Sequence, residues 1–117
     1  MKVGIVGSQY WNNYKKFKQY LTALRGAIPF DMIISGGAIG VDTMAYQYAV
    51  EQGITFVCHP PHPDEPIPQR FHRRNLRIVE ASEVIIAFPI RSSRGTRHTI
   101  SLAKKLNKEL YVIEVKE

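Results

Sequence analysis

Short apolar runs alternate with stretches whose apolar residues recur at helical spacing along the whole chain. Residues 12–25, for instance, carry Tyr14, Phe17, Leu21 and Leu24 on one stripe, and Gly26 and Pro29 are expected to end that helix. The same pattern predicts an alternating series of strands and helices. The strands are expected at 2–6, 32–34, 54–58, 84–88 and 110–115, and the helices at 12–25, 41–53, 69–81 and from Gly95 onward, with Ile100, Ala103 and Leu106 facing inward.

The predicted strands are apolar throughout, without polar alternation, and helices separate them. Strands of this kind are covered on both faces and form parallel sheets. We therefore predict an α/β domain: a three-layer, Rossmann-like fold with a parallel five-stranded sheet of order 3-2-1-4-5, which right-handed crossovers allow. In such sheets ligands bind beyond the carboxyl ends of the strands, here between the first and fourth strands. Residues 59–68 hold five of the seven prolines and are expected to form a loop.

Length and composition narrow the class of protein. The chain has 117 residues, which fits a single domain over residues 1–117, and no apolar run approaches the length of a membrane span. A lone Cys58 forms no internal disulfide, so we expect a reducing, cytoplasmic compartment; this cysteine ends a predicted strand and is expected in the core. We expect neither a metal site nor a resident cofactor, and no membrane partner.

Positive charge is concentrated in one part of the chain. The formal net charge is +6, and residues 70–98 hold seven arginines and two glutamates, so this stretch accounts for +5 of it. Arginine makes planar, bidentate contacts with phosphates. The stretch therefore favours a phosphate-bearing partner, either a nucleic acid or a small ligand.

Three loops at the carboxyl ends of predicted strands combine glycine with serine or threonine just before a helix. They are Gly7-Ser8-Gln9, Ser35-Gly36-Gly37-Ala38, and the segment from Pro89 to Thr96. Glycine lets backbone N–H groups approach an anion closely, and a helix N-terminus supplies free donors and a favourable dipole. Neither the dinucleotide-binding glycine fingerprint nor a Walker A Gly-Lys-Ser/Thr is present. The loops predict an anion site of another kind.

A few polar side chains have both a structural and a functional interpretation. Asp42 is expected in the first turn of a helix, where it either complements the helix dipole or holds an arginine or a ribose hydroxyl. His98 is either a surface residue or a general acid or base near neutral pH. His59 and His62 lie in the proline loop without a cysteine pair beside them, so they do not predict a metal site.

The aromatic residues divide in a similar way. Tyr10 and Trp11 follow the first glycine loop, and both base stacking and core packing remain open for them. Tyr14, Phe71 and Phe88 are interpreted as core residues. With these two phenylalanines in the core, few aromatic side chains would be left among the arginines to stack on nucleic-acid bases.

Taken together, these motifs resemble the SLOG superfamily. This Rossmann-like group includes nucleotide-sensing SLOG domains, the DNA-processing protein DprA/Smf and the LOG-type phosphoribohydrolases once called lysine decarboxylases. The resemblance covers almost the whole chain. It rests on Val6-Gly7-Ser8, on Ile34-Ser35-Gly36-Gly37-Ala38-Ile39-Gly40-Val41-Asp42 with Ala45 and Ala49, on Arg74-Asn75 before Ile78, on Ala87-Phe88-Pro89, and on Gly95-Thr96 with Ala103.

The resemblance implies a nucleotide pocket over the glycine loops. Asp42 and Arg74 would be polar anchors, paired with each other. The residues that would hold phosphate are Ser8, Gly36, Gly37, Gly95 and Thr96, and the rest of the predicted ligand-binding set is Gly7, Gln9, Ser35, Asn75, Pro89 and Arg97. The chain departs from the superfamily at Gln9, where an arginine is frequent, and at Thr99, where LOG-type enzymes carry their catalytic glutamate.

Three functions follow as hypotheses. The first is binding of a nucleotide or nucleotide-derived ligand at the strand ends. The alternative is single-stranded DNA binding of the DprA type, and a further alternative is hydrolysis of an N-glycosidic or phosphoester bond, with Asp42, Arg74 and His98 as candidate catalytic residues. Because Thr99 cannot act as a carboxylate base, we favour a protein that is not an enzyme. The resemblance also implies a homo-oligomer.

Overall fold

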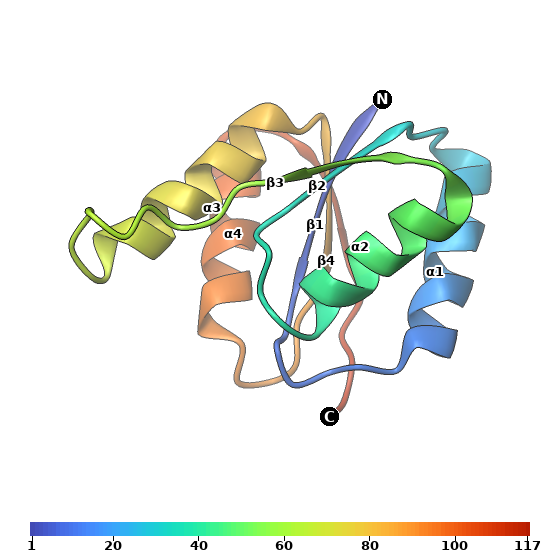
Figure 1. Cartoon of the computed structure of the whole chain (residues 1–117), viewed down its shortest axis with the longest axis horizontal. Helices are drawn as coiled ribbons and strands as arrows, with labels where there is room; N and C mark the ends of the chain where they lie inside the picture. The colour runs from blue at the N-terminus through green and yellow to red at the C-terminus, as the bar shows by residue number, and fades with distance from the viewer.

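A computed structural model describes residues 1–117, the whole chain. Strands and helices alternate as predicted, and the proline loop extends away from the body together with the start of the helix that follows it (Figure 1). The strands are β1 (Lys2–Gly7), β2 (Met32–Ser35), β3 (Thr55–Cys58), β4 (Val84–Phe88) and β5 (Glu109–Val112), and the helices are α1 (Tyr14–Ala27), α2 (Val41–Gln52), α3 (Gln69–Ala81) and α4 (Arg94–Lys105).

The five strands form one parallel sheet of order β3-β2-β1-β4-β5, which confirms the predicted α/β Rossmann-like fold. Central β1 pairs with β2 on one side and with β4 on the other, and Gly7 stands opposite Phe88 in the register. The Ser8 N–H donates to the Phe88 carbonyl at 3.1 Å, just where the two strands end. The chain leaves these two strands in opposite directions, so their carboxyl ends form the switch point of the sheet.

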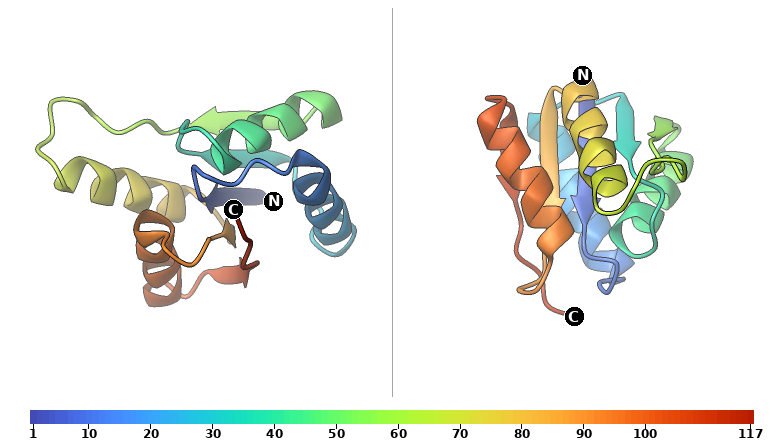
Figure 2. Two further views of the ribbon diagram at one scale, coloured as in Figure 1. Left: turned by 90° about the horizontal axis from the view of Figure 1, so that it is seen from below. Right: turned by 90° about the vertical axis from the view of Figure 1, so that its left-hand side faces the viewer.

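Helices cover both faces of the sheet, α1 and α2 on one side and α3 and α4 on the other (Figure 2). The larger apolar cluster lies under α1 and α2 and includes Phe17, Leu21 and Tyr48; the smaller lies under α3 and α4 and includes Ile78 and Ala103. Every residue of β4 is buried, as expected for a strand that is covered on both faces. Two apolar layers therefore hold the strand ends in a fixed arrangement.

Several predicted boundaries were wrong by a few residues. Helix α1 begins at Tyr14, because the Asn13 side chain caps it by accepting from the Lys16 N–H at 3.1 Å. The helix runs through Gly26 and ends at Ala27, before Pro29. Helix α4 ends at Lys105, and Leu106 beyond it is 40% exposed rather than inward-facing.

The last strand is also shorter than predicted, since β5 ends at Val112. The chain nevertheless continues beside β4: the Ile113 N–H donates to the Ala87 carbonyl at 2.8 Å and the Val115 N–H to the Pro89 carbonyl at 3.0 Å. The C-terminal segment thereby reaches the carboxyl end of β4, close to the loop that starts α4.

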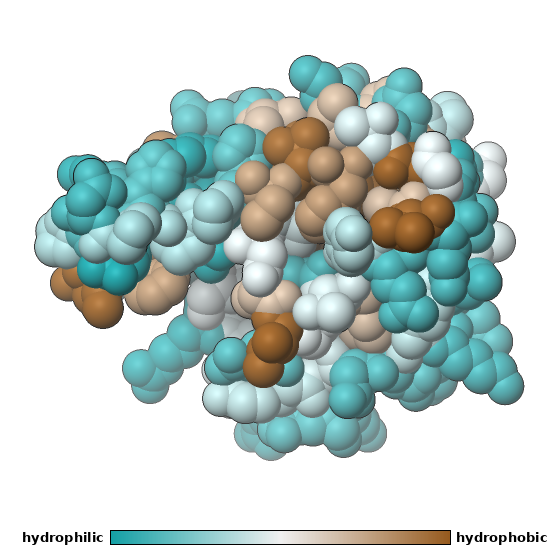
Figure 3. Space-filling model, in the orientation of Figure 1, coloured by the Kyte–Doolittle hydropathy of each residue, from teal (hydrophilic) through white to brown (hydrophobic).

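The surface is not uniformly polar. Figure 3 shows hydrophobic atoms over β3 and the neighbouring helix α2. Tyr46 and Val50 of α2 are exposed, and the Tyr46 ring lies edge-on to Phe56 of the edge strand β3, with 5.2 Å between ring centroids. No helix of the chain is both long enough and apolar enough to cross a membrane.

Candidate functional site

A cavity of about 310 Å³ opens at the carboxyl ends of the central strands, where the fold predicts a ligand. Its volume falls at the lower end of the range of small-molecule sites. It is lined by the loop after β1, the loop after β2, one face of α3, and the loop and first turns of α4. The lining residues are Val6, Gly7, Ser8, Gln9, Tyr10, Gly36, Ala38, Asp42, Phe71, Arg74, Asn75, Ile78, Ile90, Ser92, Ser93, Arg94, Gly95, Thr96 and Thr99.

Most of the predicted ligand-binding residues line this one cavity. The exceptions are Ser35, Gly37, Pro89 and Arg97. Ser35 is completely buried at the end of β2 and its hydroxyl makes no hydrogen bond of good geometry, although it lies close enough to Asp42 to favour the charged carboxylate. The topology alone thus brings together residues from four separate segments of the chain.

Glycines let the first two loops approach each other. At Gly40 the backbone has φ +77°, and a Cβ there would lie 2.6 Å from the Gln9 Cα and closer still to the Ser8 carbonyl oxygen. The Val41 N–H donates to that Ser8 carbonyl at 3.2 Å. A side chain at position 40 would push the loops apart, so glycine is required by both conformation and space.

The start of α4 is the clearest anion-binding feature of the cavity. The Ser93 side chain, at the N-cap, accepts from the Ile90 N–H at 3.0 Å and caps none of the helix amides. The first-turn residues Arg94, Gly95 and Thr96 therefore present their backbone N–H groups without a side-chain partner, and all three line the cavity. An uncapped helix N-terminus of this kind favours a negatively charged group in front of it.

Arg74 and Asp42 both lie close to Gly36, and all three residues line the cavity. Arg74 Nη1 donates to the Gly36 carbonyl at 3.1 Å, and Asp42 Oδ2 accepts from the Ala38 N–H at 3.0 Å. They do not form an ion pair, so the direct pairing expected from the family resemblance was wrong. Instead, each side chain holds one part of the loop that follows β2.

Burial changes the electrostatics of both groups. Desolvation raises the pKa of Asp42 above its ordinary value, against the opposing effects of the Ala38 N–H and the Arg74 charge. Desolvation likewise lowers the pKa of Arg74, while the Asp42 charge opposes that change. An arginine stays protonated at neutral pH even so, which leaves a poorly hydrated cation at the cavity wall.

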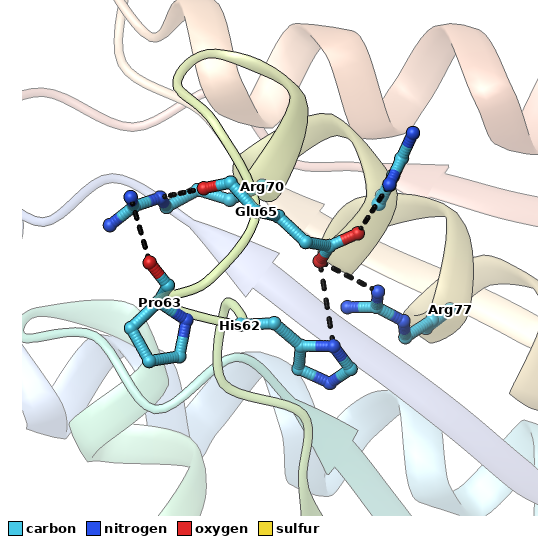
Figure 4. Close-up of polar contacts among 6 residues, drawn as sticks. His62, Pro63, Glu65, Arg70 and Arg77 are labelled. Carbon is cyan, nitrogen blue, oxygen red and sulfur yellow. Dashed lines mark hydrogen bonds and ion pairs between the residues drawn. The ribbon is translucent and has the colours of Figure 1, made fainter.

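The arginine stretch of the sequence does not form one phosphate site. Three of its members hold the proline loop instead, and Glu65 of that loop is their common partner (Figure 4). Glu65 pairs with Arg73 at 2.8 Å and with Arg77 at 2.9 Å, and these two arginines lower its pKa to about 2. Arg70 Nε donates to the Glu65 carbonyl at 2.8 Å, and its Nη2 to the Pro63 carbonyl at 3.1 Å.

The remaining arginines divide between the cavity and the surface. Arg97 pairs with Glu114 at 3.1 Å and donates to the Ile90 carbonyl at 3.1 Å, which ties α4 to the C-terminal segment. Arg94 lines the cavity, whereas Arg91 is exposed and does not. Only Arg74 and Arg94 of the seven therefore reach the cavity.

Two aromatic side chains lie at the cavity: base stacking was an open interpretation for Tyr10, whereas Phe71 was not predicted as a site residue. Tyr10 is 62% exposed and Phe71 is 40% exposed, and both line the cavity. The assignment of Phe71 to the core was wrong, because it lies one helical turn before Arg74 on the cavity face of α3. That i, i+3 spacing was the available signal. Trp11, by contrast, is buried and stacks on Phe88, with 5.6 Å between ring centroids.

Other candidate residues lie outside the cavity. His98 stacks on His72 with 4.2 Å between ring centroids, and its Nδ1 lies 3.1 Å from Asn75 Nδ2. Cys58 is exposed rather than part of the core, since β3 is an edge strand, and its sulfur lies beside Gly37. His62 lies 3.5 Å from Glu65, and no group of three or more His, Cys, Asp or Glu side chains is arranged to hold a metal ion.

The catalytic features of LOG-type enzymes have no direct counterpart in this cavity. Thr99 lines it at the glutamate position, is almost completely buried, and donates its hydroxyl to the Gly95 carbonyl at 3.3 Å. Asp42 is the sole carboxylate among the lining residues. The cavity thus combines one buried carboxylate, two arginines, an uncapped helix end and two exposed aromatic rings.

This combination of a parallel sheet, glycine loops and a cavity at the switch point defines a Rossmann-like domain. Residues 1–64 match the model of the YspA, cpYpsA-related SLOG family, called YAcAr. The chain belongs to this family. No curated protein matches it.

Solved structures share the fold at low sequence identity. DNA processing protein A (DprA) from Streptococcus pneumoniae superposes with a TM-score of 0.79 and 20% identity over 98% of this chain and 50% of its own. DNA processing protein A from Helicobacter pylori is described for its single-stranded DNA binding mode. It superposes with a TM-score of 0.76 and 23% sequence identity, over 99% of this chain and 66% of its own. The structural genomics target TM1055 superposes with a TM-score of 0.69 and 21% sequence identity, over 93% of this chain and 71% of its own. This chain therefore spans about half the length of the first protein and 66% of the second.

Proposed function

We propose that the chain binds a nucleotide or nucleotide-derived ligand in the 310 Å³ cavity, with a phosphate group at the start of α4. The observation that carries the proposal is the arrangement of two independent anion-binding features around one cavity. The uncapped first turn of α4 offers backbone N–H groups, and the guanidinium groups of Arg74 and Arg94 line the same space. Charge-assisted hydrogen bonds of this kind are the usual means of holding phosphate.

The exposed rings of Tyr10 and Phe71 support a nucleoside as the rest of the ligand. Both line the cavity that holds the arginines, so a phosphate bound there leaves the attached base within reach of an aromatic face. Stacking of a base on an aromatic side chain contributes about 1–3 kcal/mol and tolerates any base. A free phosphate uses none of this surface.

Calorimetric titration with purine and pyrimidine nucleoside mono- and diphosphates tests the proposal, and the chain offers a matched pair of variants. Arg94→Gln removes a charge at the cavity, while Arg91→Gln removes the same charge from an exposed position outside it. We expect Arg94→Gln to weaken nucleotide binding about tenfold, the loss of one charged hydrogen bond, and Arg91→Gln to have little effect. Absence of binding to every nucleotide by the folded wild-type protein would contradict the proposal.

Single-stranded DNA is a second candidate ligand, and the exposed aromatic pair favours it. Single-strand binding combines a basic groove with stacking side chains, and Tyr10 and Phe71 supply the latter beside Arg94. The fold is also shared with a protein described for single-stranded DNA binding. For DNA, Arg91→Gln and Arg94→Gln should each weaken binding and each reduce the slope of log K against log salt. For a small ligand, only Arg94→Gln should matter.

A further inference from the structure

Arg74 is held in place by two hydrogen bonds that leave one nitrogen free. Its Nε donates to Asn75 Oδ1 at 3.0 Å and its Nη1 to the Gly36 carbonyl at 3.1 Å. Nη2 makes no hydrogen bond within the protein, and it is not among the buried polar atoms that lack a partner. The side chain is therefore held in one orientation, with both N–H groups of Nη2 left for a ligand in the cavity.

The side-chain amide of Asn75 lies between Arg74 and His98, and its hydrogen bond to Arg74 determines which ring nitrogen of His98 carries a proton. A guanidinium N–H can only donate, so the oxygen of the Asn75 amide must face Arg74 Nε. The amide nitrogen then faces His98 Nδ1, 3.1 Å away on α4. Because an amide N–H₂ also only donates, Nδ1 must accept. The network thereby fixes His98 as a neutral imidazole with its proton on Nε2.

We propose that His98 is a positioning residue for the ligand site, and that its neutral form holds Arg74 in place through Asn75. This inference rests on the proposed function, since it concerns how that anion site is kept in its binding geometry. In the protonated imidazole both ring nitrogens are donors. Nδ1–H and the Asn75 amide N–H₂ would then face each other, so Asn75 must turn or withdraw. Either movement removes the acceptor from Arg74 Nε.

The surroundings of His98 favour the neutral form. From α3, His72 stacks on it. Burial, and after it the charge of this second imidazole, lowers the pKa of His98 below its ordinary value. On its own helix, Arg94 lies one turn earlier, and strand β4 contributes no charged residue. Lys2 and Glu109 begin their strands, at the far end of the sheet from the start of α4. No carboxylate pairs with either imidazole.

The direction in which anion affinity changes with pH distinguishes a positioning role of His98 from a simple effect of its charge. Protonation of His98 adds positive charge near the cavity, which by itself would strengthen the binding of an anion. Positioning through Asn75 predicts the opposite, namely weaker binding in acid. A fall in affinity on acidification is therefore specific to the proposed connection between His98 and Arg74.

Nuclear magnetic resonance of the free ¹⁵N-labelled protein tests the connection without any ligand. We expect His98 Nδ1 to be unprotonated at neutral pH, and the Asn75 side-chain NH₂ and Arg74 Nε–H signals to shift with the same midpoint as His98 on acidification. In Asn75→Ala the Arg74 Nε–H signal should no longer follow His98. Overturning results are an Nδ1–H tautomer at neutral pH, or Asn75 and Arg74 signals that stay fixed while His98 titrates.

Binding of adenosine diphosphate between about pH 5 and about pH 8 provides the functional readout. His98→Gln can supply an amide oxygen that accepts from Asn75 and does not titrate, whereas His98→Ala supplies no acceptor. Relative to His98→Gln, the wild-type protein should lose affinity as His98 becomes protonated, up to about tenfold at full protonation, while His98→Ala should bind weakly throughout. Because all variants meet the same nucleotide, the titration of its phosphate cancels in these ratios.

His62→Gln is the matched control, since His62 is exposed and contacts Glu65 of the proline loop. It should keep the wild-type pH profile. A wild-type profile parallel to that of His98→Gln would overturn the inference. If adenosine diphosphate does not bind at any pH, the proposed function fails for this nucleotide, and the resonance measurements on the free protein still decide whether His98 positions Arg74.

Discussion

Gly36→Ala tests how the cavity wall depends on a missing side chain. A Cβ at this position would lie 3.0 Å from the Arg74 Cζ and 3.2 Å from Asp42 Oδ2, and it would overlap Arg74 Nη1. The backbone at Gly36 does not have a positive φ, so alanine is not strained there by conformation. The substitution therefore acts through Arg74, which must move away from the Gly36 carbonyl.

The expected loss of stability is small, because the displaced group is the end of a flexible side chain. A hydrogen bond from a charged group contributes about 1.5–3 kcal/mol, and part of this is recovered when Nη1 turns toward the water in the cavity. We expect the free energy of unfolding in urea to fall by about 1–2 kcal/mol, with an unchanged m-value. Nucleotide affinity should fall at least about tenfold, because Arg74 no longer points into the site.

Gly26→Ala is the control for this measurement. Gly26 lies within α1, and a Cβ there meets nothing within 4 Å. Gly26 is the next-to-last residue of α1, so alanine gains at most the roughly 0.8–1 kcal/mol of a helix interior, and this variant should be at least as stable as the wild type and bind nucleotide equally well. A Gly36→Ala protein with wild-type affinity would refute the role of Arg74. A loss of more than about 3 kcal/mol would mean that the backbone, rather than Arg74, is constrained at this position.

Three further variants test other parts of the account. Gly40→Ala should lower the free energy of unfolding in urea by at least about 2 kcal/mol, because alanine is strained at positive φ and its Cβ would collide with the Gln9 backbone. An unchanged urea midpoint of unfolding would contradict this. Asp42→Asn should change the pH dependence of stability. Burial raises the pKa of Asp42, so the wild type loses stability as pH rises from about 4 through the folded-state pKa. The free energy of unfolding of Asp42→Asn should not show this decrease. Glu65→Gln should speed proteolysis of the proline loop, since Arg73 and Arg77 lose their common partner, whereas the exposed neighbour Asp64→Asn should not; equal cleavage of both variants would argue against the contact.

The order of the strands and helices could be predicted because the periodicity of apolar residues in the sequence matches the residues that are buried in the structure. Continuous apolar runs such as Val84–Phe88 have no exposed face to offer, so they specify buried parallel strands, and the glycine loops then meet at one edge by topology. Boundaries depend on weaker local effects. The Asn13 oxygen caps α1 through one hydrogen bond. The end of α4 involves backbone hydrogen bonds from Leu106, Asn107 and Lys108 back to its last turns, which the apolar pattern does not contain.

The chemistry of the site was less accessible from sequence. Seven arginines in one stretch indicated an anion, but charge does not specify the partner of each side chain. Glu65 takes two of the seven because the proline loop folds back along α3, which no periodic signal predicts. Phe71 is exposed because it lies near the start of α3, where the helix extends beyond the sheet that would cover it (Figure 1).

A phosphate site at the start of α4 is tested most directly by the change in backbone amide resonances of the ¹⁵N-labelled protein on addition of adenosine diphosphate. We predict that the largest shifts occur at Gly95 and Thr96 in the first turn of α4, and at Gly36 in the loop after β2, which also lines the cavity. Shifts concentrated on the hydrophobic surface around Tyr46 and Val50, or along the arginines that hold the proline loop, would contradict a phosphate site at the start of α4.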